Sequence, residues 1–263
     1  LLIERGTPVV TSAGAYPTFN FHVTGYGGKL HTVPYVNDCE DPESLIAKAI
    51  EVSAKMIYFA NPDNPMGSWH SANVVNSLID DLPKSTLLVL DEAYVELAPV
   101  GTAPALRPNT PNVIRMRTFS KAYSLAGMRA GYGIASSAEL ALGYHKVRGN
   151  FTINRIAIAG AVAAYKDTSH RDAYLSENAR QRARLKKGLE SLGFKAFPSS
   201  ANFITVQSPI PTEDLVTHLA ENQILIQALT WPGAGPCLRI SVGSNDDITA
   251  FLNFLTTYIK KDY

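Results

Sequence analysis

The chain has 263 residues, enough for one large domain or for a large domain followed by a smaller one. Apolar residues make up 46% of it and the formal net charge is +1, which argues against bulk attraction to nucleic acid or to an acidic membrane surface. The longest apolar run, residues 156–165, is too short to span a bilayer. The two cysteines have neither the spacing of a disulfide scaffold nor that of a metal site, so we expect a cytoplasmic protein.

Up to about residue 135, short β-rich runs alternate with helical patterns, which predicts an α/β sheet flanked by helices. The run 87–90 is apolar on both faces, as a central strand of a parallel sheet is. Asp41 followed by Pro42 is typical of a helix start. The expected strands are 8–12, 29–34, 56–60, 86–90, 112–117 and 131–135, and the expected helices are 17–25, 42–53 and 71–82.

After Gly149 the pattern changes. An Ala-rich helix at 153–166, mostly buried, is followed by a long charged helix at 172–192 that ends at Gly193. The remaining pattern indicates a small α+β domain, with strands near 194–197, 203–207 and 238–242 and helices near 212–222 and 246–260. We therefore expect a large domain over residues 1–168 and a small domain over residues 169–263.

The segment 118–131 carries the densest set of chemically useful side chains. It follows an expected strand, so it forms a loop at the carboxyl end of the sheet, where open α/β sheets bind ligands. The hydroxyls of Thr118 and Ser120 and the guanidinium of Arg129 suit a phosphate group. Lys121, beside that phosphate site, could serve as a Schiff-base nucleophile. An ordinary basic loop with a solvated lysine is the alternative.

Two further strands end in polar groups. Asp91 follows the apolar run 87–90 and could hold a protonated pyridine nitrogen, or simply cap a helix. Tyr94 could donate its hydroxyl to a ring oxygen, or bond to backbone. Asn64 lies in a rigid turn of two Asx-Pro units and could point its amide at the same ligand.

Arg239 lies on an expected strand of the small domain. Leu238, Ile240 and Val242 alternate inward, so Arg239 faces the other side, where it could bind an anionic substrate group. A surface arginine without function is the alternative.

Together these segments resemble fold-type I enzymes that use pyridoxal 5′-phosphate (PLP), the class I and II aminotransferases, and above all the histidinol-phosphate aminotransferases. The motifs occur in the family's order from about Gly6 to the C-terminus. They are Asn-Pro-x-Asn-Pro-x-Gly, Asp-Glu-Ala-Tyr, Ser-Lys-x-x-x-Leu-Ala-Gly-x-Arg and Arg-Ile-Ser-Val-Gly. The resemblance implies a mostly parallel sheet flanked by helices, a small C-terminal α+β domain and a homodimer.

The resemblance also assigns roles to single residues. Lys121 is the imine-forming lysine and Asp91 the partner of the pyridine nitrogen, while Asn64 and Tyr94 contact the ring oxygen. Arg239 matches the arginine that holds the substrate's carboxylate or phosphate. Thr118, Ser120 and Arg129 bind the cofactor phosphate. Phe19 stacks on the cofactor ring, with a phenylalanine of the core as the alternative.

Two departures from the family pattern stand out. Met66 replaces the usual threonine of the Asn-Pro-Thr-Gly motif. Family members also carry an earlier loop that binds the cofactor phosphate and an N-terminal arm that meets the dimer partner, and we expect both to lie outside the given sequence. PLP affinity and activity of the 263 residues alone depend on that segment.

The implied reaction moves an amino group from an amino-acid-like donor, such as histidinol phosphate, to 2-oxoglutarate, with Lys121 as general base and acid. The alternatives are a PLP-dependent decarboxylase of the threonine-phosphate decarboxylase type, an aromatic amino-acid aminotransferase, and a non-enzymatic ligand-binding domain of a regulator. We interpret the basic stretch 180–187 as a solvated helix face rather than a nucleic-acid site. The scattered histidines predict no metal site.

Overall fold

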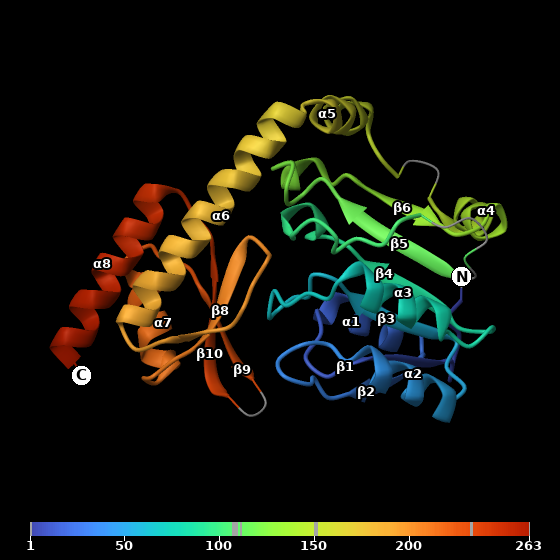
Figure 1. The fold of residues 1–263 in the computed structure, drawn as a ribbon, viewed down its shortest axis with the longest axis horizontal. Coiled ribbons are helices and arrows are strands. Elements are labelled where there is room, and N and C mark those ends of the chain that lie inside the picture. The colour runs from blue at the N-terminus through green and yellow to red at the C-terminus, as the bar shows by residue number, and fades with distance from the viewer. Residues whose placement is uncertain (1, 107–109, 111, 150–151, 232–233, 263) are drawn as a thin grey trace.

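The computed structural model describes residues 2–106, 110, 112–149, 152–231 and 234–262, which form two sheets connected through a long helix (Figure 1). The larger sheet has six strands in the order β2-β1-β3-β4-β5-β6. All neighbours in it are parallel except β5 and β6, which are antiparallel. Its strands are β1 (Pro8–Ser12), β2 (Lys29–Val33), β3 (Met56–Ala60), β4 (Leu87–Asp91), β5 (Val113–Thr118) and β6 (Gly131–Ala135).

Helices cover both faces of this sheet because successive strand residues point to opposite sides. On one face, Ile57 and Leu88 pack with Leu45 of α2 (Pro42–Glu51) and Leu78 of α3 (Ala72–Asp80). On the other, Val9, Met56, Leu87 and Ile114 pack with Val23 of α1 (Pro17–Gly25) and Leu140 of α4 (Ala138–Val147). The sheet is therefore buried on both sides, as the apolar run 87–90 predicts.

The second sheet has four antiparallel strands in the order β7-β8-β10-β9. Its strands are β7 (Lys195–Ala196), β8 (Phe203–Gln207), β9 (Gln227–Trp231) and β10 (Gly235–Ser241), and its helices are α6 (Thr168–Ser191), α7 (Thr212–Glu221) and α8 (Asn245–Asp262). The core between them contains Leu185, Leu215, Leu238 and Phe251. The fold class expected from the sequence, with its small C-terminal α+β part, is thus confirmed.

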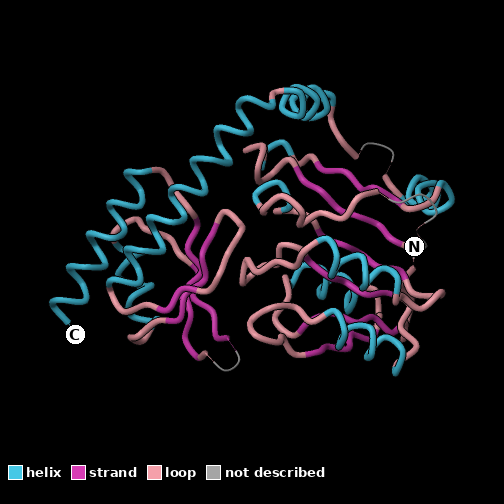
Figure 2. The backbone as a smooth tube through the Cα atoms, in the orientation of Figure 1, coloured by secondary structure: helices cyan, strands magenta, loops and turns pink. Residues whose placement is uncertain are grey.

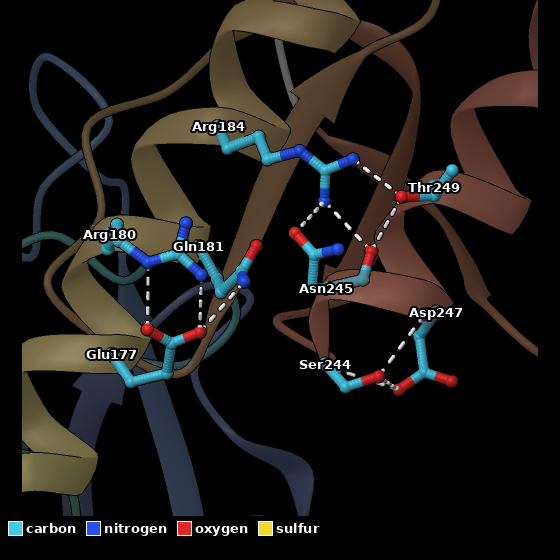
Figure 3. Close-up of polar contacts among 8 residues, drawn as sticks. All are labelled: Glu177, Arg180, Gln181, Arg184, Ser244, Asn245, Asp247 and Thr249. Carbon is cyan, nitrogen blue, oxygen red and sulfur yellow. Dashed lines mark hydrogen bonds and ion pairs between the residues drawn. The ribbon is translucent and has the colours of Figure 1, made fainter.

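Polar contacts set the ends of the helices in this smaller part. Gly193 has a φ of 85°, a conformation that glycine adopts without penalty, and its N–H bonds to the carbonyl of Glu190 at 3.1 Å to close α6. At the start of α8, Ser244 and Asp247 bond to each other, and Arg184 of α6 donates to Thr249 at 2.6 Å (Figure 3). These contacts fix α8 against α6.

Helix α5 (Arg155–Lys166) is not the mostly buried helix that its composition predicts. Only Ala157 and Ala161 are buried, whereas Ile156 is 73% exposed and Tyr165 58% exposed. The helix packs on the rest of the chain through its alanines, so its larger apolar side chains face outward. The expected domain boundary near residue 168 lies at the break between α5 and α6 and stays a prediction.

Within the part of the chain that the structure describes, no helix is long and apolar enough to cross a membrane. Both cysteines, Cys39 and Cys237, are free thiols. The cytoplasmic location stays a prediction.

Candidate active site

A cavity of about 510 Å³ lies at the carboxyl ends of β3, β4 and β5, on the side of the large sheet that faces the smaller one. Figure 2 shows the loops of the large sheet gathered between the two sheets. This is the edge at which open α/β sheets bind ligands. All the site residues expected from the sequence except Phe19 line this cavity: Asn64, Asp91, Tyr94, Thr118, Ser120, Lys121, Arg129 and Arg239.

Lys121 lies just beyond β5, and its Nζ is 5.2 Å from the centroid of the Tyr94 ring. Burial raises the pKa of Tyr94 to about 12, so its hydroxyl stays protonated at neutral pH and can donate a hydrogen bond. The Nδ2 of Asn64 donates to that hydroxyl at 3.4 Å. An amine, a phenol and an amide therefore share one wall of the cavity.

Asp91 is the last residue of β4 and supplies the carboxylate of the cavity. Its Oδ1 accepts the N–H of Ala93 at 2.9 Å, and its Oδ2 accepts the hydroxyl of Tyr58 at 2.7 Å. Burial raises the pKa of Asp91, while the bonds from Tyr58 and Ala93 and the charge of Lys121 oppose that rise. The carboxylate is thus held by hydrogen bonds that favour its ionised form.

Hydroxyls and a guanidinium line the side of the cavity nearest β5. The N–H of Ser120 donates to Oγ1 of Thr118 at 3.0 Å, which fixes the first turn of the loop. Arg129 adopts a left-handed conformation, φ 55° and ψ 42°, that is uncommon outside glycine. Its NH1 donates to the carbonyl of Ala126 at 2.8 Å. Backbone conformations of this kind concentrate at ligand sites.

Arg239 reaches the cavity from the smaller sheet. Its neighbours Leu238 and Ile240 are buried in the core of that sheet, so the alternation predicted for this strand is confirmed. The NH1 of Arg239 donates to Oδ1 of Asn64 at 2.6 Å, and its guanidinium lies over the Phe203 ring at 5.2 Å. The turn that carries Asn64 therefore joins the two sheets at the cavity.

Phe19 does not line the cavity. Its ring stacks on Tyr58, with the centroids 4.4 Å apart and the planes inclined by 20°. Tyr16, three residues earlier, lines the cavity instead. Tyr16 precedes Pro17 at the start of α1 and is 42% exposed, whereas Phe19 lies within the helix and packs on Tyr58 of the sheet.

Sequence reasoning also missed Tyr58 and Arg117, which both line the cavity. Tyr58 lies inside an otherwise apolar strand, and nothing in the motifs indicates its contact with Asp91. Arg117 alternates with Met116 on β5 and donates through Nε to the buried carboxylate of Glu92 at 2.9 Å. An arginine on a strand at the edge of the loop is the only signal that could have indicated it.

Two buried acidic side chains, Asp63 and Glu40, lie at the turn that carries Asn64. Oδ1 of Asp63 accepts the hydroxyl of Tyr35 at 2.9 Å, and Oε2 of Glu40 accepts the hydroxyl of Ser12 at 2.7 Å. Burial raises the pKa of Asp63 to about 7, and burial together with Asp63 raises the pKa of Glu40. Oδ2 of Asp63 also accepts the N–H of Met66 at 3.2 Å, a contact within the turn.

These groups fit PLP. The cofactor needs an amine to form a covalent link, an anion for its ring nitrogen and donors for its phosphate, and the cavity contains each of them. Among the described residues, no group of three or more His, Cys, Asp or Glu could hold a metal ion. Fold and site together define a PLP-dependent enzyme.

Comparison with known proteins identifies the family. Residues 1–255 match the family "Aminotransferase class I and II". The chain is 31% identical to histidinol-phosphate aminotransferase 1 of Nitrosococcus oceani, over 99% of this chain and 71% of that protein. It is 32% identical to histidinol-phosphate aminotransferase 3 of Rhizobium meliloti, over 97% of this chain and 70% of that protein.

A solved structure agrees with these relatives. The crystal structure of histidinol-phosphate aminotransferase from Sinorhizobium meliloti in complex with PLP superposes with a TM-score of 0.94 at 40% identity, over 98% of this chain and 72% of that one. The chain therefore belongs to the class I and II aminotransferase family. It is a PLP-dependent aminotransferase that resembles the histidinol-phosphate aminotransferases.

Proposed function

We propose that this aminotransferase transfers an amino group from histidinol phosphate, or a closely related amino donor, to 2-oxoglutarate. The observation that carries the proposal is that Arg239 enters the same cavity as Lys121 and Asp91 and bonds to Asn64. One guanidinium near the amine can hold an anionic group of each substrate in turn. The names of the relatives at 31%, 32% and 40% identity support histidinol phosphate as the donor.

We assign the cofactor's polar contacts to residues that already lie in place. Thr118, Ser120 and Arg129 would hold the phosphate, and Asp91 the ring nitrogen. Asn64 and the protonated hydroxyl of Tyr94 would hold the ring oxygen. Tyr16, which lines the cavity, would make the contact with the cofactor ring that the motifs assign to Phe19.

When bound, PLP supplies a conjugated ring that delocalises the electron pair left at the substrate's α-carbon. Lys121 would take the α-proton of the substrate on Nζ as general base and, as general acid, deliver it to the cofactor carbon that is bonded to the amino nitrogen. Asp91, as a carboxylate, would keep the ring nitrogen protonated, so that the developing negative charge is stabilised. Arg239 fixes the substrate so that its α-proton faces Lys121.

We also propose that the chain works as a homodimer. The exposed apolar face of α5 supports this, since Ile156, Ile158, Val162 and Tyr165 are all between 46% and 73% exposed. Sedimentation or light scattering of the PLP-loaded protein would give its mass. A monomeric mass at the concentrations used for activity would contradict the proposal.

The lysine is tested through absorption and borohydride. The PLP-loaded protein should show an absorption band of the covalently held cofactor, and borohydride should fix pyridoxal to Lys121. Lys121→Ala should lose the band and all transamination. Lys187→Ala, which removes an exposed lysine of α6, should keep both. A normal band in Lys121→Ala would refute the assignment.

The donor is tested by a screen with 2-oxoglutarate as acceptor. Histidinol phosphate should give the highest kcat/KM, and aromatic amino acids should give lower values. A higher value for an aromatic amino acid would replace the proposed donor without changing the role of Lys121. Carbon dioxide release without consumption of 2-oxoglutarate would indicate a decarboxylase instead.

A further inference from the structure

Tyr58 has a position that no motif indicates. It lies in the middle of β3, two residues before Ala60, which pairs with Asp91 of β4 in the parallel register. Residues 58 and 60 face the same side of the sheet, and so do residues 89 and 91. Tyr58 is therefore the diagonal neighbour of Asp91 on the cavity side, close enough for its hydroxyl to reach Oδ2 at 2.7 Å.

The direction of this hydrogen bond is fixed by chemistry. Burial and the neighbouring charge of Asp91 raise the pKa of Tyr58 well above its ordinary value, so the hydroxyl keeps its proton and donates it. The second oxygen of Asp91 is held by the N–H of Ala93 at 2.9 Å. With a donor on each oxygen, the carboxylate plane has one preferred orientation, and both hydrogen bonds oppose the rise in the pKa of Asp91 that burial causes.

The Tyr58 ring is itself held from behind. Phe19 of α1 stacks on it at 4.4 Å, and both rings belong to an apolar cluster with Ala15, Ala60 and Val89. Tyr58 is only 4% exposed. Phe19 therefore fixes the place of the hydroxyl without contacting Asp91.

We propose that Tyr58 is a positioning residue that acts through Asp91, and that Phe19 supports it by stacking on its ring. By donating to Asp91, Tyr58 makes that carboxylate a weaker base, so that a proton shared with the cofactor's ring nitrogen stays on the nitrogen. Tyr58 thereby maintains the charge distribution on which proton removal from the substrate depends. The inference rests on the pairing of Asp91 with the ring nitrogen proposed above.

The test uses the whole protein loaded with PLP that carries ¹⁵N in its ring, because the nitrogen's chemical shift reports its protonation directly. Tyr58→Phe removes one oxygen and keeps the stack on Phe19. We expect the fraction of ring nitrogen that is protonated at neutral pH, read from this chemical shift, to fall, and PLP to bind roughly three- to tenfold more weakly. Phe19→Leu should lower the protonated fraction of the ring nitrogen by a smaller amount.

Tyr35→Phe is the matched control, since it removes the same kind of hydrogen bond, from a buried tyrosine to the carboxylate of Asp63. It should lower the thermal midpoint much as Tyr58→Phe does and leave the protonated fraction of the ring nitrogen unchanged. If neither Tyr58→Phe nor Phe19→Leu changes the protonated fraction of the ring nitrogen, the role of Tyr58 is overturned. Should Tyr58→Phe not fold, Phe19→Leu decides alone.

Asp91→Asn distinguishes a failure of the inference about Tyr58 from a failure of the proposed pairing between Asp91 and the ring nitrogen. If Asp91→Asn abolishes ring protonation and Tyr58→Phe leaves it intact, Asp91 keeps its role and only the inference about Tyr58 fails. If Asp91→Asn leaves the ring protonated, the pairing of Asp91 with the nitrogen fails, and the inference about Tyr58 fails with it.

Discussion

The buried ion pair at Glu92 should be one of the largest single contributions of a polar side chain to the stability of the large sheet. The Glu92 side chain is 1% exposed and that of Arg115 7% exposed. Arg115 donates to both oxygens of Glu92, at 2.6 and 2.9 Å, and Arg117 adds a third bond at 2.9 Å. Glu92→Gln keeps the shape but leaves two guanidinium groups without their common carboxylate.

Breaking a buried pair in this way costs about 3–5 kcal/mol, because the remaining charge stays in a poorly solvated place. At about 2–4 °C per kcal/mol for a chain of this size, the thermal midpoint should fall by roughly 10 °C. Circular dichroism of the PLP-loaded protein at pH 7 measures the midpoint, and urea unfolding gives an independent comparison.

The control is the ion pair between Glu177 and Arg180 on α6, which has similar geometry at the surface (Figure 3). Its side chains are 52% and 58% exposed. Solvent screens such pairs, so Glu177→Gln should leave the midpoint unchanged within error. If Glu92→Gln costs no more than Glu177→Gln, the argument from burial is wrong.

Two further predictions concern the turn that carries Asn64. Gly67 has a φ of 77°, and a Cβ there would collide with the side chain of Ser199. Gly67→Ala should therefore lower the free energy of unfolding by more than the ~1 kcal/mol that the left-handed backbone conformation alone costs an alanine. Gly101→Ala, where φ is 90° and the space around the Cβ is open, measures that backbone cost alone, and urea unfolding compares the two variants. The pKa of Asp63 is raised to about 7, so the folded state binds more protons than the unfolded state between about pH 4 and pH 7, and stability from this group falls as pH rises through that window. Asp63→Asn should flatten this pH dependence of the urea midpoint, and an unchanged slope would place the titration elsewhere.

Most of the large sheet can be predicted from the sequence because each strand there is a short apolar run between polar turns. The bounds of β1, β3 and β6 agree with the expected ranges, β2 differs by one residue at its end, and β4 and β5 are each shifted by one residue. The site follows from the same regularity. Parallel strands bring Asn64, Asp91 and Lys121 to one edge although 57 residues separate the first from the last (121 − 64).

The elements that sequence reasoning missed have weak patterns. Strand β9, Gln-Ala-Leu-Thr-Trp, has only one buried residue, Trp231, and so lacks the apolar run of a central strand. Helix α4 has no buried residue and a mixed composition. Helix α5 shows the opposite failure, since its apolar composition predicts a mostly buried helix whereas only Ala157 and Ala161 are buried. Composition predicts that apolar surface is covered, but not which part of the structure covers it.

Asp91 and Glu92 show what a motif leaves undetermined. They are adjacent acids at the end of one strand, and in an extended chain adjacent side chains point to opposite sides. Asp91 therefore enters the cavity, where Tyr58 holds it, while Glu92 turns away and binds Arg115. Arg117 lines the cavity and also donates a hydrogen bond to Glu92, so Glu92 is connected to the cavity through Arg117. Substitutions at Glu92 should consequently lower stability first and alter the cofactor site only through Arg117, whereas substitutions at Asp91 should act on the cofactor directly.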